Sequence, residues 1–254
     1  MIAVPKEVQA VLDVLRGKGH EAFPVGGCVR DSLRGVEPED WDICTSALPA
    51  EVMEIFPGSR PTGLKHGTVT VVVGSRSAEV TTFRTEGNYR DHRRPDSVTF
   101  VPDLLSDLAR RDFTMNAIAL SADGMITDPY GGVADIQNRC IRCVGEAKTR
   151  FEEDALRMFR ALRFSARLGF TIEPETLRAI EDCAPTASEL APERVRDEIE
   201  KILLTPRPET VGIAIGFGLL SRYVGNGAAL PGLAKIAKMP KKALPRWAAL
   251  SIMP

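Results

Sequence analysis

Hydrophobic positions follow two different patterns along the chain, and the change falls near residue 145. Before it, short apolar runs alternate with turn residues and short helical stretches, as the strands of a mixed sheet do. The predicted strands are Ala22–Val25, Thr68–Val73, Ala78–Phe83, Ala117–Leu120 and Ile141–Val144, and the predicted helices are Pro49–Phe56, Leu104–Arg110 and an amphipathic segment within residues 1–19. This pattern predicts an α/β first half.

After about residue 151 the apolar positions recur with a helical period instead. The predicted helices are Glu152–Leu168, Pro174–Asp182, Pro192–Leu204 and Pro208–Leu219. Proline stands at or near the start of several of them and Gly169 follows the first, which is the usual asymmetry of helix ends. The second half is therefore predicted to be all-α.

The composition is that of an ordinary globular protein, with 33 lysines and arginines against 34 aspartates and glutamates among 254 residues. Because the formal net charge is −1, any affinity for nucleic acid must come from local positive charge, such as the acid-free stretch after Glu209. No apolar run reaches the ~18 residues of a membrane span, and residues 1–19 lack the apolar core of a signal peptide. The cytoplasm is therefore the expected compartment.

The five cysteines are odd in number and irregularly spaced, which argues against a secreted disulfide framework. Cys140 and Cys143 form a CxxC pair, but a second pair and nearby histidines are missing from the sequence around them. We expect structural cysteines on a strand, with a zinc or redox role as the alternative.

The first candidate for chemistry is the segment PVGGCVRD, residues 24–31. A strand that ends in two glycines and runs into a helix presents backbone N–H groups to a ligand, which suits a phosphate. A plain structural turn is the alternative, because glycine pairs are common wherever a strand must bend.

Three carboxylates follow on predicted strands. Asp40 and Asp42 alternate with Trp41, so both carboxylates point to one face of a strand. Carboxylates that crowd together suit Mg²⁺, which takes hard oxygen ligands and would activate a hydroxyl and stabilise leaving pyrophosphate. Glu79 interrupts an apolar, β-branched run and is the third candidate. A solvated surface pair, and a strand with one solvent face, are the respective alternatives.

Six segments in this order resemble the class II tRNA nucleotidyltransferases of the polymerase β-like superfamily, which comprise CCA-adding enzymes, CC-adding and A-adding relatives, and bacterial poly(A) polymerases. They are GGCVRD, DWDI with the following CTSALP, KHGTVTVVV, AEVTTFR, RRDFTMNAIA and EEDALRMFRALRFSARLGF. The resemblance runs from about Phe23 to Leu204. It implies an α/β nucleotidyltransferase head at residues 1–150, an all-α neck that recognises the base at 151–205, and a partial helical body at 206–254.

The resemblance also implies roles for individual residues of the head. The nucleotide triphosphate would be held by Gly26, Gly27, Arg30 and Asp31. Asp40 and Asp42 would bind the catalytic Mg²⁺ ions, with Glu79 as a further catalytic carboxylate. The ribose and phosphate side of the pocket would be organised by Arg111, Asp112 and Asn116, although the basic pair at 110–111 also fits the C-terminus of a plain helix.

Base choice is implied to lie in the segment EDALR, whose Asp154 and Arg157 match the residues that read the incoming base in the family. On one continuous helix they would lie roughly 60° apart. A carboxylate and a guanidinium together accept cytosine and adenine and oppose the carbonyls of uracil and guanine. An i,i+3 surface salt bridge is the alternative. Arg160 and Arg163 extend this stripe toward nucleotide phosphates, or else form a solvated face.

The implied reaction is template-independent addition of CMP, CMP and AMP from CTP and ATP to the 3′ end of tRNA, with Mg²⁺ as cofactor. The polar segment 85–96 resembles a flexible loop that CCA-adding and A-adding members keep. Typical members continue well beyond residue 254, so a truncated or short form is expected. An A-adding enzyme or poly(A) polymerase, and a catalytically silent RNA- or nucleotide-binding remnant, are the alternatives. No membrane or protein partner is implied.

Overall fold

The computed structural model describes residues 2–86, 98–223 and 233–251 of the chain. These divide into two compact units, the first containing residues 2–86 and 98–138 and the second residues 139–223 and 233–251. The segment that resembles the family's flexible loop, residues 85–96, lies mostly outside the described residues, because it overlaps the undescribed range 87–97. None of the described helices is long and apolar enough to cross a membrane.

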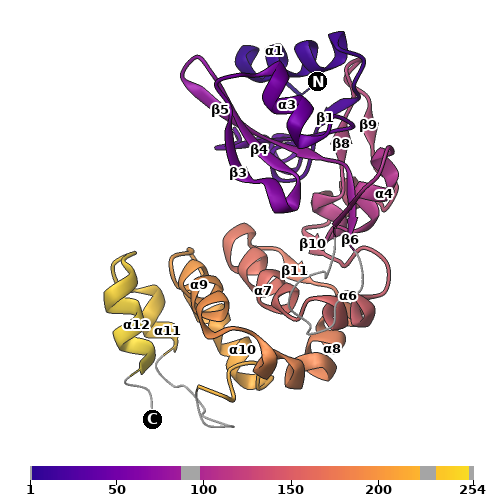
Figure 1. Ribbon diagram of the computed structural model, residues 1–254. Coiled ribbons are helices and arrows are strands. Elements are labelled where there is room, and N and C mark those ends of the chain that lie inside the picture. The colour runs from indigo at the N-terminus through magenta and orange to yellow at the C-terminus, as the bar shows by residue number, and fades with distance from the viewer. Residues whose placement is uncertain (1, 87–97, 224–232, 252–254) are drawn as a thin grey trace. The chain divides into compact units, whose positions relative to one another are not determined.

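The first unit is built on a five-stranded sheet in the order β1-β2-β5-β4-β3. Figure 1 labels four of these strands, β1, β3, β4 and β5. Its strands are β1 Ala22–Pro24, β2 Trp41–Thr45, β3 Arg60–Gly63, β4 Thr68–Val73 and β5 Arg76–Thr82. β2 and β5 run parallel, whereas the other neighbours are antiparallel. The α/β prediction for this half is therefore confirmed, with β4 at the predicted residues.

One face of this sheet forms the core of the first unit. Ile43, Val69 and Val80 lie side by side across three strands and are fully buried. Helices α1 (Lys6–Gly17) and α3 (Pro49–Ile55) contact β4 and β5 (Figure 1). α1 buries an apolar stripe of Val8, Val11, Leu12 and Leu15 at helical spacing. The opposite face of the sheet carries polar side chains, among them Asp42, Glu79 and Thr70, and is the face on which we look for a functional site.

The remaining elements of the first unit surround the ends of β1, β2 and β5. They are α2 Gly27–Leu33, β6 Arg84–Glu86, β7 Val98–Phe100, α4 Leu104–Ala109, the 3-10 turn η2 Thr114–Asn116, β8 Ala119–Leu120, β9 Ile126–Thr127 and α5 Gly132–Gln137. β6 pairs with β7 in an antiparallel ladder, and β8 pairs with β9. A bridge between Val25 and Ala119 joins β1 to β8, so the motif around residues 110–119 lies beside the glycine turn.

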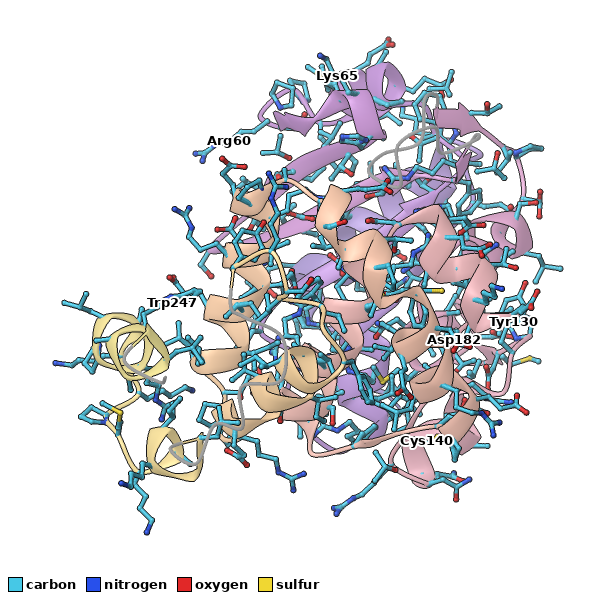
Figure 2. The ribbon with its side chains drawn as sticks, turned by 90° about the horizontal axis from the view of Figure 1, so that it is seen from below. Arg60, Lys65, Tyr130, Cys140, Asp182 and Trp247 are labelled. Atoms are coloured by element: carbon cyan, nitrogen blue, oxygen red, sulfur yellow. The ribbon has the colours of Figure 1, made fainter. Side chains whose placement is uncertain are left out.

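The second unit is helical apart from one short ladder. Its helices are α6 Ala147–Glu153, α7 Leu156–Leu168, α8 Pro174–Cys183, α9 Pro192–Leu203, α10 Val211–Gly216, α11 Leu233–Ala237 and α12 Ala243–Ser251, with 3-10 turns η3 Ala184–Glu189 and η4 Pro208–Thr210. α7 packs on α9. Trp247 lies on α12 (Figure 2), and its indole N–H donates to Glu200 of α9 at 3.1 Å.

Three predictions for this half need correction. The helix expected at Glu152–Leu168 is interrupted, because α6 ends at Glu153 and Asp154 has an extended backbone with φ −139°. The helix expected at Pro208–Leu219 is the turn η4 followed by the shorter α10. The half is also not purely helical, since β11 (Thr171–Ile172) pairs in parallel with β10 (Cys140–Ile141). The domain limits at 150 and 205 stay a prediction.

Candidate active site

The candidate active site begins with two carboxylates on neighbouring strands. Asp42 of β2 lies directly opposite Glu79 of β5 in the parallel register, so their side chains share the open face of the sheet. Asp40 lies just before β2 and is exposed, Glu79 is exposed, and Asp42 is half-buried. Trp41 is buried on the other face. The fold thus brings together all three carboxylates that the sequence suggests.

Asp42 is electrostatically strained in this position. Burial, followed by the negative charge of Glu79, raises the pKa of Asp42 to about 6, and Asp40 adds to the effect. The positive charges of Arg111 and Arg30 act in the opposite direction. The carboxylate therefore lies within the field of two acidic and two basic side chains, all of them predicted site residues.

The donor set of this cluster fits a hard cation such as Mg²⁺, because carboxylate oxygens are its preferred protein ligands. The described part of the chain contains no group of three or more His, Cys, Asp or Glu side chains that are already arranged around a common metal position. Asp40 and Asp42 would hold the ion with Glu79 beside them, and substrate phosphates would supply further oxygens. The cysteine pair lies elsewhere, with Cys140 on β10 and Cys143 buried.

The glycine turn links β1 to α2 and requires glycine at one of its two positions. Gly26 has φ 77° and ψ −126°, a conformation that side-chain-bearing residues avoid. A Cβ atom on Gly26 would lie 3.1 Å from Nη1 of Arg111. Glycine at this position therefore also leaves room for the Arg111 guanidinium. Its backbone is fixed on both sides, because the Val25 N–H donates to the backbone carbonyl of Asp42 and the Gly26 N–H to that of Ile118.

Arg30, on α2, connects the glycine turn to the motif around residues 110–119. Its Nη1 donates to the side-chain oxygen of Asn116 at 2.7 Å, and the side-chain Nδ2 of Asn116 donates to the carboxylate of Asp112 at 3.2 Å. Arg30 also forms a 2.8 Å ion pair with Asp31. Although burial opposes it, the Arg30 and Arg34 guanidiniums hold the pKa of Asp31 below its usual value. Four predicted site residues therefore form one connected network.

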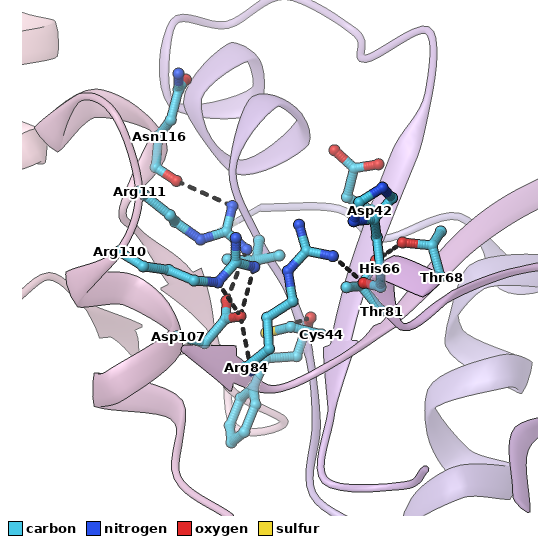
Figure 3. Close-up of polar contacts among 12 residues, drawn as sticks. Asp42, Cys44, His66, Thr68, Thr81, Arg84, Asp107, Arg110, Arg111 and Asn116 are labelled. Atoms are coloured by element: carbon cyan, nitrogen blue, oxygen red, sulfur yellow. Dashed lines mark hydrogen bonds and ion pairs between the residues drawn. The ribbon is translucent and has the colours of Figure 1, made fainter. Parts of the chain in front are cut away.

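Arg111 belongs to a second network of ion pairs and hydrogen bonds. The sequence analysis did not predict its central residue, Asp107. The buried carboxylate of Asp107, on α4, pairs with both Arg110 and Arg111, and it also accepts from the backbone amide of Arg84 (Figure 3). The side chain of Arg84 donates to the carbonyl of His66 (Figure 3). The available signal was the spacing, since Asp107 stands three and four residues before the two arginines on a predicted helix.

The second unit contains the residues predicted to read the base, in a geometry different from the expected one. Asp154 lies in the break between α6 and α7, where one carboxylate oxygen accepts from the Leu156 amide at 3.0 Å and the other from Arg194 at 3.2 Å. Arg157, buried in α7, pairs instead with Glu153 at 2.5 Å. The expectation that both residues lie on one continuous helix is therefore wrong, because the backbone of Asp154 is extended. Their role in reading the base stays a prediction.

Arg160 and Arg163 follow on α7 and both stack on the ring of Phe164. Arg163 also forms a 2.9 Å ion pair with the buried Glu198 of α9. These contacts give Arg163 a structural role at the α7–α9 interface. A phosphate-binding role for the two arginines stays a prediction.

Comparison with known protein families matches both units. The family described as "Poly A polymerase head domain" matches residues 22–142, and the one described as "Probable RNA and SrmB- binding site of polymerase A" matches residues 169–222. The mixed α/β unit with its carboxylate edge is accordingly a nucleotidyltransferase head, and a helical region follows it.

Individual relatives agree with the family match. A CCA-adding enzyme of Geobacillus thermodenitrificans is 49% identical over 95% of this chain and 59% of its own length. One from Lactiplantibacillus plantarum is 46% identical over 96% of this chain and 60% of its own length.

Two solved structures extend the comparison. The Bacillus stearothermophilus CCA-adding enzyme in complex with CTP has a TM-score of 0.87 at 42% identity, covering 97% of this chain and 62% of its own. A Thermotoga maritima CCA-adding enzyme complexed with tRNA has a TM-score of 0.71 at 26% identity, covering 87% of this chain and 53% of its own. This chain belongs to the class II CCA-adding enzyme family, and it spans about 60% of the length of these curated relatives.

Proposed function

We propose that this chain carries the nucleotide-transfer activity of a CCA-adding enzyme, adding CMP, CMP and AMP from CTP and ATP to the 3′ end of tRNA. The observation that carries the proposal is the register of β2 and β5, which sets Asp42 opposite Glu79 on the open face of the sheet. Relatives named CCA-adding enzymes, one solved with CTP and another with tRNA, support the choice of substrates. We also propose the cytoplasm as its compartment, since none of the five cysteines forms a disulfide.

In the proposed reaction the 3′ hydroxyl of tRNA attacks the α-phosphate of the nucleotide and pyrophosphate leaves. Mg²⁺, held by Asp40 and Asp42, would supply charge stabilisation at the reacting phosphate. The protein contributes position and charge, because the chemistry requires no covalent intermediate. Arg30 and Arg111 point their positive charges toward the glycine turn, where the triphosphate would bind, and the two hydrogen-bonded networks keep them in place.

Base choice is proposed for Asp154 and Arg157. Arg194 fixes one oxygen of Asp154 and Glu153 fixes Arg157, so each recognition group has its own partner. A carboxylate accepts the exocyclic amine shared by cytosine and adenine, and a guanidinium donates to the neighbouring ring nitrogen. Uracil and guanine present a carbonyl in place of that amine and would be rejected.

A second candidate is an A-adding enzyme or poly(A) polymerase, favoured by the head family's description. One assay separates these candidates. The protein is incubated with Mg²⁺, labelled CTP or ATP, and tRNA ending before CCA, after C, or after CC. A CCA-adding enzyme extends all three acceptors with the matching nucleotide. An A-adding enzyme uses only ATP on the CC end, a poly(A) polymerase produces long tails, and a silent remnant gives no product.

A further inference from the structure

Asp107 is a charged residue that the proposed chemistry does not itself require. Its side chain has an exposed fraction of 0%, so neither solvent nor substrate reaches it. It lies on α4, and no motif that carries the family resemblance includes it. A buried carboxylate is costly unless it is paired, so the partners of Asp107 define what it does.

The two carboxylate oxygens of Asp107 have different partners. Oδ1 accepts from Nε and Nη2 of Arg110, at 3.0 and 2.7 Å, and from the backbone amide of Arg84 at 3.3 Å. Oδ2 accepts from Nη2 of Arg111 at 2.9 Å (Figure 3). Burial disfavours its charged form, but the charges of Arg111 and Arg110 hold the pKa of Asp107 below its usual value.

One arginine is enough to neutralise one carboxylate, so the second requires its own explanation. Arg110 already binds Oδ1 through two nitrogens. Arg111 is a second guanidinium on the same carboxylate, and its positive charge also acts on the carboxylate of Asp42. A guanidinium held by carboxylates on the protein side, with another edge at the surface, is placed to bind a further anion such as a phosphate.

The far end of Arg111 shows where that anion would lie. Its Nη1 donates to the backbone oxygen of Asn116 at 3.4 Å and lies 3.1 Å from the Cβ position of Gly26, directly at the glycine turn. The Arg111 side chain keeps an exposed fraction of 18%, in contrast to Asp107. Its guanidinium thus extends from a buried carboxylate to the turn where the triphosphate is proposed to bind.

We propose that Asp107 is a positioning residue that fixes the Arg111 guanidinium at the glycine turn for the phosphates of the incoming nucleotide, while Arg110 balances the charge of Asp107. The inference rests on the proposed function and adds to it a residue that acts on the nucleotide only through Arg111. Charge-assisted contacts of this kind are strong and directional, so losing the carboxylate releases Arg111 without removing its charge.

The test compares Asp107→Asn with Asp103→Ala, a matched control on the same helix. Asp103 is exposed and caps α4 by accepting from the Ser106 amide at 2.8 Å, so its loss weakens α4 without touching Arg111. Asp107→Asn is expected to raise KM for CTP by roughly tenfold or more, with a smaller change in kcat. Asp103→Ala is expected to have the same KM for CTP as the wild-type protein.

A double variant separates a positioning role from a merely structural one. If Asp107 acts through Arg111, adding Asp107→Asn to Arg111→Ala raises KM no further than Arg111→Ala alone. If the two increases multiply, or if Asp107→Asn leaves KM unchanged, the proposal is wrong. Should circular dichroism show that Asp107→Asn is unfolded, Asp107→Glu takes its place, because it keeps the charge but shifts the carboxylate, and the same two outcomes decide.

A spectroscopic measurement makes the inference independent of activity. The ¹⁵N-labelled Arg111 Nε–H signal, assigned by its loss in Arg111→Lys, should be resolved in the unchanged protein and in Asp103→Ala, and should broaden or shift in Asp107→Asn. A signal that stays unchanged in Asp107→Asn overturns the positioning role, whatever the activity. Absence of nucleotide transfer by the unchanged protein overturns the proposed function, while a displaced Arg111 signal in Asp107→Asn still supports the role of Asp107.

Discussion

At the residue scale, Asp42 combines a proposed catalytic role with a cost to the fold. Its pKa of about 6, against 3.8 for an ordinary aspartate, means that the folded state binds the proton more tightly than the unfolded state. The stability that the protonated group contributes is therefore present below pH 3.8 and is lost as the pH rises through about 6. At neutral pH the ionised carboxylate opposes folding until a cation binds.

Asp42→Asn should accordingly abolish nucleotide transfer and stabilise the metal-free protein. We expect a gain in the free energy of unfolding on the order of 1–3 kcal/mol at pH 7.5, which disappears near pH 4. Thermal unfolding across this pH range measures it. Added Mg²⁺ should raise the Tm of the unchanged protein and not that of the variant. Full transfer activity in Asp42→Asn would exclude the carboxylate as a metal ligand.

Asp154 offers the second prediction at this scale. Asp154→Asn keeps an oxygen that can cap α7 through Leu156, but it replaces an acceptor by a donor for the carbonyls of uracil and guanine. An unpaired polar group costs about 1–3 kcal/mol, so preference for CTP over UTP should fall roughly 5- to 150-fold. The ratio of kcat/KM for the four nucleotides measures this preference, with the exposed Arg178→Ala as control. An unchanged ratio would assign Asp154 to capping alone.

At the scale of elements, the turn between β1 and α2 depends on the left-handed backbone of Gly26 rather than on glycine in general. Gly26→Ala forces a Cβ into a positive φ and toward Arg111, whereas Gly27 lies in the helix and a Cβ there would be 3.7 Å from Arg30. Gly26 and Gly27 are thus adjacent glycines with different structural requirements.

Gly26→Ala should therefore lower the free energy of unfolding by about 1–2 kcal/mol and weaken nucleotide binding, because Arg111 must move away. Gly27→Ala is the matched control and should change both quantities much less. Urea unfolding and titration with CTP measure the two effects. Equal losses in the two variants would mean that the turn responds to added bulk rather than to backbone conformation.

At the scale of the whole molecule, a buried arginine attaches the last described helices of the second unit to α9. Arg246 of α12 donates to the backbone oxygens of Leu203 and Thr205 at the end of α9, and to those of Met239 and Pro240. Its exposed fraction is 4%. These carbonyls lie where a helix has no partners of its own, and the negative end of the α9 dipole favours a cation there.

Arg246→Met should leave those carbonyls unpaired and lower the free energy of unfolding of the second unit by about 2–4 kcal/mol. Calorimetry should show a shift of the transition of this unit only, and limited proteolysis should cut near α11 and α12 first. Lys242→Ala, at an exposed position, is the control. A uniform shift of the whole unfolding curve would mean that the two units unfold together.

The sequence by itself determined the main elements of both units and which residues of the head are candidates for chemistry. Period-2 alternation fixes which strand residues share a face, so the pattern alone places Asp42 and Trp41 on opposite faces of their strand. The glycine pair and the helical period of α8 and α9 are equally local signals. The family resemblance, carried by short motifs, suggested roles for those residues, and these roles stay a prediction.

Only the tertiary structure decided which of these residues meet. The pairing of Asp42 with Glu79 depends on the parallel register of two strands that are far apart in the sequence, and local patterns do not specify such a register. At the break between α6 and α7, Asp154 binds Arg194, 40 residues away, and a helical pattern of neighbouring residues does not specify such a contact. Asp107 has the sequence pattern of an ordinary surface residue on a short helix. In the fold it is buried, and the Arg84 amide of the neighbouring β6 donates to it. Burial is a property of the packed chain and not of a residue's neighbours in the sequence.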